Sequence, residues 1–535
     1  MKYVFPSRRS EVMSTRGIVA TSQPLAAQAG ISMLLQGGNA VDAAIATAAA
    51  LNVVEPMATG LGGDAFALVY MSNGRELKAL NASGRAPYAA SLERFRSLGY
   101  QEMPATGIHA VTIPGALDGW CSLLEKYGTM NLAQVLAPAI NLAENGFPVT
   151  EIIGHLWETN SAKLRSNTSA ARTYLIDGRA PKVGEVVTQP DLARTFKKIA
   201  EGGRDVFYRG EIAEAIVACS RENGGLITMQ DLNDHTSTWV TPISTSYHGY
   251  DVFECPPNDQ GLVVLLALNI LETYNLPSLG HNSAEYLHLL IEAVKLAFAD
   301  ANKYVADPDF VDIPLKELLD KPYAEQRRQL IDMNHAQQEV HAGTPSINGD
   351  TVYLAVTDKE GNSVSFINSL YQGFGSGIVV GGTGICLQNR GSLFSLEAGH
   401  SNCIAPHKRP YHTIIPAMAF KNGNLFLTFG IMGGFMQPQG HVQMLLNIID
   451  FRMGLQTALD APRFRYIRGN ECIFERGIPA GVLRELANKG HHITKLDDPY
   501  SQQFGGGQVI MIDLASKALV AGSDCRKDGC AIGVW

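Results

Sequence analysis

The chain has 535 residues, a mass of 57.7 kDa and 46% hydrophobic residues, which is typical of a large globular protein. Its net charge of −8 at pH 7 comes without a run of basic residues, so we expect no nucleic-acid partner. No uncharged apolar segment reaches the roughly 18 residues of a membrane span, so we expect no membrane partner. The N-terminus lacks the apolar core of a secretory signal, and the eight cysteines form no Cys-x-x-Cys pair. Both features favour reduced thiols and a cytoplasmic location.

The first part of the chain predicts two helices and a strand. Residues 24–37 have helical spacing, and Asn39 is placed to cap a second helix over residues 40–51. The small apolar residues of this second helix indicate burial on most sides. The apolar run at residues 65–70 then predicts a buried strand, within a strand-rich stretch that ends near residue 111.

The middle of the chain is mainly helical in pattern. Helical spacing covers most of residues 117–345, and we interpret Pro138 and Pro190 as helix starts. A strand pair is predicted at residues 244–253. The polar residues 325–348 lack periodicity, so we expect an exposed, mobile segment there.

A hairpin follows that segment, with Thr351 at the head of its first strand. Residues 351–358 and 363–371 predict two strands joined by a turn at residues 360–362. A threonine hydroxyl needs a neighbouring base to act as a nucleophile. Cleavage just before Thr351 would supply one, because a free α-amine titrates at roughly 7.7–8.0. The alternative is that Thr351 simply opens a buried strand.

The C-terminal part alternates strands and helices. Its patterns predict strands at 424–430, 472–475 and 508–513, and helices at 442–451 and 481–489. Helices covering a two-layer antiparallel sheet would accommodate these elements, which places the chain in the α+β class.

Several separated stretches resemble the γ-glutamyltransferase (γ-glutamyltranspeptidase) family and follow its order. They are residues 37–56, 113–115, 138–148, 205–210, 224–232 and 521–529. The resemblance implies an N-terminal-nucleophile (Ntn) hydrolase, an αββα sandwich with extra helices. It also implies a proenzyme that cuts itself into a large and a small subunit, which stay together as one domain.

The family's cleavage point corresponds to the Asp350–Thr351 bond in this chain. The resemblance therefore implies a large subunit of residues 1–350 and a small subunit of residues 351–535. It makes Thr351 both the agent of maturation and the catalytic nucleophile. A homo-oligomer of this processed heterodimer remains open.

Three further residues match catalytic positions of the family. Gly433 and Gly434 correspond to the glycine pair whose N–H groups form the oxyanion hole, and Ser369 takes the place of a second threonine beside the nucleophile. The alternatives are an ordinary strand-to-helix turn and an ordinary strand serine.

The residues expected to bind substrate depart from the family pattern. Tyr371 replaces an asparagine, Leu393 replaces the aspartate that holds the substrate α-amino group, and His412-Thr413 replace a serine pair. Arg85 is displaced by two positions from the arginine that holds the α-carboxylate. A solvent-facing Arg85 and a purely structural His412 are the alternatives.

These departures leave two substrate classes open. A γ-glutamyl amide such as glutathione is the expectation for the family, but Leu393 cannot pair with an ammonium. The pattern also resembles that of cephalosporin acylases, whose glutaryl substrates lack the α-amino group. Nothing in the sequence points to a metal or an organic cofactor.

Other functions receive less support from the sequence. The chain has no His-Glu-x-x-His or Gly-x-Ser-x-Gly motif, and residues 373–377 lack the spacing of a nucleotide-binding loop. A binding protein that keeps the fold but never cleaves itself is the main non-enzymatic alternative.

Overall fold

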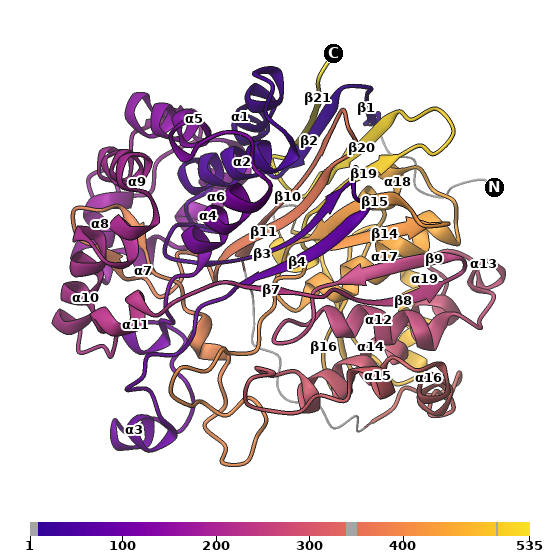
Figure 1. Cartoon of the computed structure of the whole chain (residues 1–535). Helices are drawn as coiled ribbons and strands as arrows, with labels where there is room; N and C mark the ends of the chain where they lie inside the picture. The colour runs from indigo at the N-terminus through magenta and orange to yellow at the C-terminus, as the bar shows by residue number, and fades with distance from the viewer. Residues whose placement is uncertain (1–8, 339–349, 499–500) are drawn as a thin grey trace.

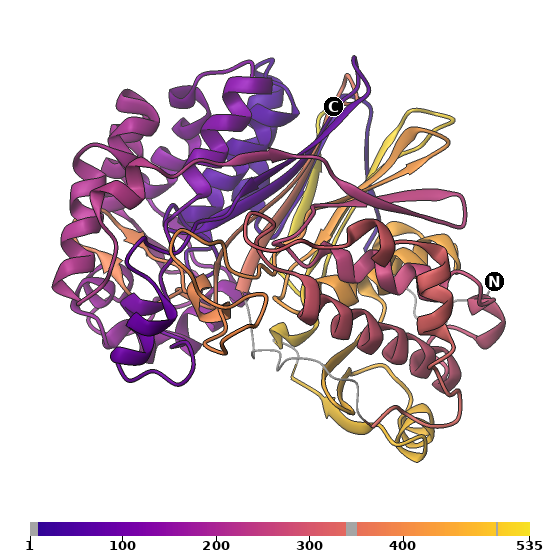
Figure 2. The ribbon, with the colours of Figure 1, turned by 60° about the horizontal axis from the view of Figure 1, so that its bottom comes forward.

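In the computed structural model, which describes residues 9–338, 350–498 and 501–535, two antiparallel sheets pack face to face between layers of helices. Figures 1 and 2 show the sheets at the centre, with helices outside both of them. This arrangement confirms the predicted α+β class and the αββα sandwich. Among the described residues, no helix combines the length and the apolar character needed to cross a membrane.

The first sheet contains the predicted hairpin at its centre. Its strands, in spatial order, are β21 (Cys530–Gly533), β2 (Gly17–Thr21), β10 (Asp350–Asp358), β11 (Ser363–Tyr371), β3 (Asp64–Met71), β4 (Glu76–Ala82) and β7 (Thr238–Val240). The second sheet contains β1 (Val12–Ser14), β20 (Leu519–Ser523), β19 (Gly507–Ile512), β15 (Asn424–Ile431), β14 (Ala417–Lys421), β9 (Tyr250–Glu254) and β8 (Ile243–Tyr247). Both sheets combine strands from before and after residue 350, so the two parts of the chain are interleaved.

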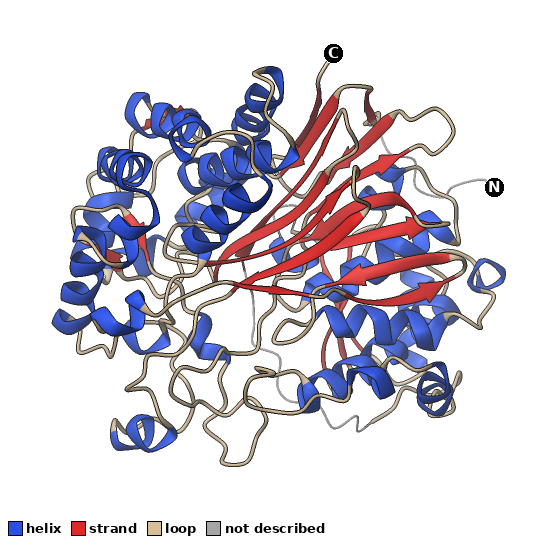
Figure 3. Cartoon of the chain, viewed as in Figure 1, coloured by secondary structure: helices blue, strands red, loops and turns tan. Residues whose placement is uncertain are grey.

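Separate groups of helices cover the outer faces of the sheets (Figure 3). The first sheet is covered by α1 (Pro24–Leu35), α2 (Ala40–Val54), α4 (Ala116–Tyr127), α5 (Leu132–Asn145) and α9 (Pro190–Tyr208). The second sheet packs directly against α12 (Gly261–Leu271), α17 (Met436–Ile449) and α18 (Leu455–Asp460). Helix α14 (Ala284–Tyr304) packs on α12, and α19 (Ala480–Asn488) packs on α14. A small sheet of β16 (Phe464–Arg468), β17 (Glu471–Glu475) and β18 (His492–Leu496) adjoins this second group.

A hydrophobic core lies between the two sheets and shows which face of each strand points inward. Tyr353 of β10 and Ile367 of β11 belong to this core, together with Phe66, Met418 and Ile510. Because side chains alternate along a strand, residues on the same face as Ile367 also point toward the second sheet. Ser365 obeys this rule, since its Oγ donates to the carbonyl oxygen of Phe429 in β15 at 3.3 Å.

Local sequence signals explain the best-predicted elements. Asn39 caps α2, and its side chain accepts the N–H of Val41 and Asp42 while the Asp42 carboxylate accepts the N–H of Asn39 at 2.8 Å. Every residue of α2 is buried, as its composition predicted. The hairpin forms strands β10 and β11 over the predicted residues, and its turn uses Gly361 at φ +81°.

Some predicted boundaries are wrong. Pro138 does not start a helix but lies inside α5, which begins at Leu132 and is capped by Asn131 with Gln134. Helix α17 begins at Met436 rather than at residue 442. Of the segment predicted to be exposed and mobile, residues 325–328 lie in helix α16 (Lys321–Arg328), and residues 339–349 lie outside the described residues.

A buried ion pair lies within α14, and its lysine also bonds a residue from the second part of the chain. The Lys295 Nζ lies 2.7 Å from Glu292 Oε1 and donates to Asn470 Oδ1 at 2.8 Å. Both charged side chains have 0% exposure. A buried carboxylate that loses its cation keeps its desolvation cost without the compensating attraction.

We expect Lys295→Met to lower the free energy of unfolding by roughly 3–5 kcal/mol, because Glu292 would remain buried without a cation. Urea denaturation measures this change. Arg468→Met is the matched control, because the Arg468 and Glu471 side chains are 61% and 48% exposed and such pairs contribute below ~1 kcal/mol. Equal effects of the two substitutions would contradict the prediction, whereas a Glu292→Leu/Lys295→Met double variant should regain part of the loss.

Candidate active site

Thr351 and Ser369 face each other across the β10–β11 pair. Their Oγ atoms lie 3.2 Å apart, and the residues are 1% and 0% exposed. Ser369 lies on the same face of β11 as Ile367, so it points into the layer between the sheets. The Ser369 Oγ also accepts the backbone N–H of Tyr371 at 2.8 Å, which holds this hydroxyl beside the threonine.

The first residues of β10 form an irregular ladder. Asp350 lies opposite Tyr371, but Val352 lies opposite Asn368, so the pairing shifts across Thr351. Such a bulge redirects a side chain and is frequent beside active sites. Tyr371 itself has φ +80°, which is rare for a bulky residue. The Asp350–Thr351 bond therefore lies in irregular backbone rather than in a uniform strand.

Gly433 and Gly434 form the turn between β15 and α17, with φ values of +116° and +60°. An added Cβ at Gly433 would lie 3.1 Å from the Cα of Gly505, so both the conformation and the close approach require glycine. Within the described part of the chain, neither N–H group has a hydrogen-bond acceptor. Two such donors at a helix N-terminus can stabilise a negatively charged oxygen.

Gln260 connects this glycine turn to the segment that contains Thr413. Its Nε2 donates to the carbonyl oxygen of Gly434 at 2.9 Å and to that of Thr413 at 2.7 Å. Its Oε1 lies 3.3 Å from the Tyr411 hydroxyl. No sequence pattern predicts this role of Gln260, because a buried glutamine before a helix has no signature of its own.

A neutral hydrogen-bonded pair holds the end of β15. The His441 Nε2 accepts the N–H of Ile431 at 3.0 Å, and its Nδ1 lies 2.9 Å from Glu254 Oε1. Burial lowers the pKa of His441 to about 3. Burial, together with the nearby Asp259, raises the pKa of Glu254 well above its usual range. Both groups are therefore uncharged, and the pair positions the backbone that leads into the glycine turn.

Arg390 joins two of the predicted substrate-binding residues, although the sequence analysis assigned it no role. It opens the 3₁₀ helix η2 (Arg390–Leu393) and has 0% exposure. Its Nη1 donates to Thr413 Oγ1 at 2.7 Å, and its guanidinium carbon lies 4.4 Å from the centre of the Tyr371 ring. Leu393 closes the same helix and packs, half-buried, against the core beside the second sheet.

His412 is a buried supporting residue in this structure. Its Nε2 lies 3.0 Å from Asp64 Oδ2, and its Nδ1 accepts the N–H of Ile414 at 3.4 Å. Burial, with the nearby charge of Arg390, lowers the pKa of His412 to about 3, so its ring is neutral and Nε2–H donates to Asp64. These bonds engage both ring nitrogens, so His412 positions the adjacent Thr413.

Arg85 contacts a different part of the molecule. Its Nη1 donates to the carbonyl oxygen of Thr236 at 3.3 Å, and its Nη2 lies 3.8 Å from Asp309 Oδ2. None of its described contacts involves Thr351 or Ser369. The structure thus brings Tyr371, Leu393, His412 and Thr413 together around Arg390 but leaves Arg85 outside this group.

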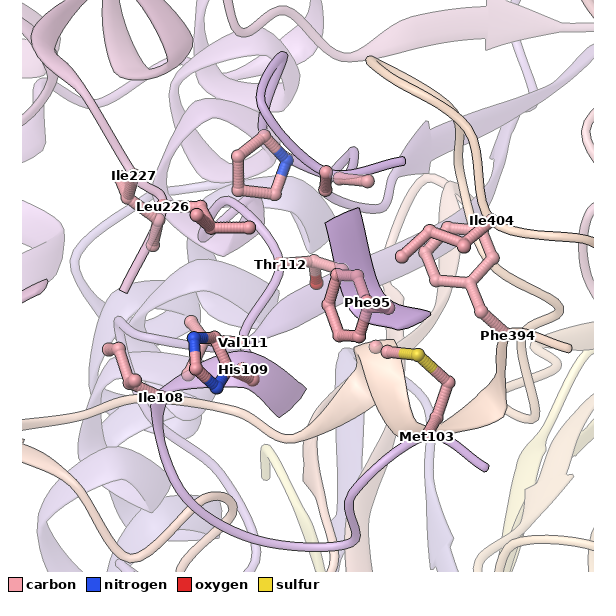
Figure 4. A pocket seen from close by; sticks show the side chains of 14 residues that line it. Phe95, Met103, Ile108, His109, Val111, Thr112, Leu226, Ile227, Phe394 and Ile404 are labelled. Carbon is pink, nitrogen blue, oxygen red and sulfur yellow. The ribbon is translucent and has the colours of Figure 1, made fainter. Parts of the chain in front are cut away.

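Two cavities adjoin the site. A cavity of about 340 Å³ is lined by Phe435, which follows the glycine pair, and by Arg465 and Gln503. This volume is within the range of ligand pockets. Figure 4 shows a second, apolar pocket between Phe95, Phe394 and the segment around Val111. Its cavity volume is only about 10 Å³, so it is filled by its own side chains.

One histidine–carboxylate group has a spacing that could hold a metal ion. Among the described residues, ligand atoms of His288, Glu292 and His491 lie within 4.8 Å of one another. However, His288 Nδ1 and His491 Nε2 are hydrogen-bonded at 2.8 Å, and Lys295 already neutralises Glu292. These contacts already engage His288, His491 and Glu292 with other partners, so the spacing alone does not indicate a metal site.

Comparisons with known proteins match the whole chain. A sequence model of the family described as gamma-glutamyltranspeptidase matches residues 26–534. The chain is 40% identical over 529 residues to the glutathione hydrolase-like YwrD proenzyme of Bacillus subtilis (strain 168), covering 98% of this chain and 99% of that protein. It is 35% identical over 540 residues to the acylase ACY 1 proenzyme of Pseudomonas sp. (strain SE83), covering 99% and 96% of the two chains.

The fold is also shared with solved structures. A cephalosporin acylase from Bacillus halodurans superposes with a TM-score of 0.94 at 45% identity, covering 100% of this chain and 98% of that chain. Two of these three similar proteins are described as proenzymes, and two as acylases. The superposition covers the whole of this chain and therefore includes both sheets.

Acidification should destabilise the fold through the buried histidines. Burial lowers the pKa of both His412 and His441 to about 3, whereas an unfolded histidine titrates near ~6.5. Their stabilising contribution is therefore complete above pH ~6.5 and is lost as the pH falls toward 3, by about 1.4 kcal/mol per histidine at pH ~5.5. Thermal denaturation between pH 7.5 and 5 should show the decline.

His412→Gln should weaken this pH dependence, because glutamine can still donate to Asp64 but does not titrate. The number of protons taken up on unfolding should fall by about one. His335→Gln is the matched control, because the His335 side chain is 77% exposed and the same substitution there should leave the pH dependence unchanged. An unchanged pH dependence in His412→Gln would show that His412 is not neutral in the fold.

Proposed function

Because the chain belongs to the γ-glutamyltranspeptidase family, we propose that it is a self-processing amide hydrolase in which Thr351 is the nucleophile. The observation that carries the proposal is the buried contact between Thr351 and Ser369, with 3.2 Å between their Oγ atoms. The amides of Gly433 and Gly434, which have no acceptor among the described residues, would supply the second requirement of acyl transfer, a site for an oxyanion.

Maturation would use the same hydroxyl as catalysis. The Thr351 Oγ attacks the carbonyl carbon of Asp350, the C–N bond breaks, and an ester joins Asp350 to the threonine side chain. Water then hydrolyses this ester and leaves a free α-amine on Thr351. The irregular pairing of Asp350 and Val352 supports this step, because it frees the bond from a regular ladder.

Turnover would follow with the new amine as general base. The amine, which titrates at roughly 7.7–8.0, takes the proton of Thr351 Oγ as this oxygen attacks the substrate carbonyl. The glycine amides stabilise the tetrahedral oxyanion, and the leaving amine departs with a proton. Water, or an acceptor amine, then releases the acyl group from Thr351.

The two cleavage products would remain one domain. In the first sheet, β10 pairs with β2 and β11 pairs with β3, so strands on both sides of the cut are hydrogen-bonded to each other. In the second sheet, β14 pairs with β9 in the same way. Residues 1–350 and 351–535 are therefore expected to stay associated as large and small subunits.

The proposed substrate is a small amide of the γ-glutamyl type, as in glutathione. The similarity to a glutathione hydrolase-like proenzyme supports this class. Glutaryl amides are the second candidate, because Leu393 offers no charge to a substrate ammonium and because similar proteins are described as acylases. The two classes share an acyl chain that ends in a carboxylate.

Replacement of Thr351 tests the mechanism most directly. We expect the wild-type protein to yield a fragment that begins at Thr351, and Thr351→Ala to remain one chain without amidase activity. Thr351→Ser should still cleave, because it keeps a hydroxyl. Intact mass and N-terminal sequencing of the purified proteins measure the outcome.

Thr357→Ala is the matched control, because Thr357 and Ser363 form a similar buried hydroxyl contact of 2.8 Å on the same two strands. It should be cleaved normally. Cleavage of Thr351→Ala would refute the proposal, and a wild-type chain that stays whole would favour a binding protein instead.

A further inference from the structure

The Arg390 guanidinium is buried without a full set of partners. Its residue has 0% exposure, and only Nη1 is engaged, by Thr413 Oγ1 at 2.7 Å. The Nε and Nη2 groups have no hydrogen-bond acceptor among the described residues. A buried cation with unpaired donors is costly, so these donors call for a partner that the described residues do not supply, and an anionic ligand would satisfy both their hydrogen bonds and their charge.

Asp64 is the acidic residue whose charge acts on Arg390, but it does not accept the open hydrogen-bond donors of the guanidinium. Asp64 interacts electrostatically with Arg390, but no ion pair joins the two among the described residues. Its Oδ1 accepts Gly84 N–H at 2.8 Å and Gln388 Nε2 at 2.9 Å, and its Oδ2 contacts His412. Asp64 therefore offsets part of the charge of Arg390 but leaves its open donors unpaired.

Arg390 is connected to both halves of the proposed catalytic group. It stacks on the ring of Tyr371, whose N–H bonds the Ser369 Oγ beside Thr351. On the other side, Thr413 is linked through Gln260 to the carbonyl oxygen of Gly434. Arg390 is therefore linked through one residue to the Ser369 hydroxyl and through Thr413 and Gln260 to the glycine turn.

A second buried arginine adds to the positive charge. Arg465 is 3% exposed, its Nε has no acceptor among the described residues, and its charge acts on Tyr371. Its Nη1 donates to the carbonyl oxygen of Gln503 at 3.2 Å. Two cations around one tyrosine favour an anion and disfavour an ammonium in the same space.

We propose that Arg390, with Thr413, binds the terminal carboxylate of the substrate's acyl group, an inference that rests on the proposed amide hydrolase function. The planar guanidinium offers two parallel donors, which match the two oxygens of a carboxylate. The substrate class is then a monoamide of a short dicarboxylic acid. An α-ammonium is not required, so glutaryl amides should be cleaved at least as well as γ-glutamyl amides.

Three chromogenic anilides test this assignment: glutaryl, γ-glutamyl and the uncharged butyryl compound. The wild-type enzyme should prefer glutaryl over butyryl by roughly 10- to 150-fold in kcat/KM. Arg390→Gln should reduce this preference to within a few fold, mainly by slowing the glutaryl compound. Arg390→Lys, which keeps the charge but loses the paired donors, should be intermediate.

Self-cleavage at Thr351 reports whether each variant has folded with an intact nucleophile. Arg85→Gln separates the two candidate arginines. Loss of the glutaryl preference in Arg85→Gln, with its retention in Arg390→Gln, would overturn the assignment to Arg390. An Arg390→Lys enzyme that self-cleaves and keeps the full wild-type preference would also overturn it.

Ligand binding gives a measurement that does not depend on turnover. Glutarate should raise the thermal midpoint of the wild-type protein and not that of Arg390→Gln, whereas butyrate should raise neither. If the wild-type protein cleaves no amide but glutarate still stabilises it, the hydrolase function fails and the carboxylate site stands. If it cleaves all three anilides equally and glutarate has no effect, the carboxylate site alone fails.

Discussion

Strand β10 lies in the middle of the first sheet, and this position constrains the rest of the molecule. It pairs with β2 from the start of the chain and with β11 from its own hairpin. Thr351 at its head therefore reaches its buried place beside Ser369 only when strands from distant parts of the sequence have assembled. The proposed self-cleavage at Thr351 would therefore depend on prior folding.

Hydrogen bonds from buried side chains hold the backbone segments of the site in position. These side chains are neutral rather than charged. His441 holds Ile431 at the end of β15, and Gln260 holds Gly434 in the turn that follows. His412, which is held by its hydrogen bond to Asp64, fixes the backbone of the next residue, Thr413. Neutral, buried groups suit this task, because they lock geometry without adding a charge to the reaction centre.

Charge near the proposed nucleophile comes instead from Arg390 and Arg465. Their burial leaves part of their hydrogen-bonding capacity unused among the described residues. This is a destabilising arrangement that a functional site can tolerate when a ligand completes it. Leu393 and these two cations together favour the proposed acyl group, which carries a carboxylate and needs no ammonium.

The sequence by itself determined the elements whose signals are local. The capping box of Asn39 and Asp42, the buried composition of α2 and the turn at Gly361 predict their structures from neighbouring residues. The ordered resemblance to a known family also indicated Thr351, Ser369 and the glycine pair. Pro138 was misread, because the capping residues Asn131 and Gln134 outweigh one proline inside a helix.

Only the tertiary structure decided which polar residues meet in the site. Arg390 and Thr413 are 23 positions apart, and Gln260 and Gly434 are 174 apart, so no spacing rule connects them. The same assembly buried His412 against Asp64 and left Arg85 beside Thr236. The periodicity of a sequence predicts which face of a helix or strand is buried. The partner of a buried polar group depends instead on how distant segments pack, which only the complete fold decides.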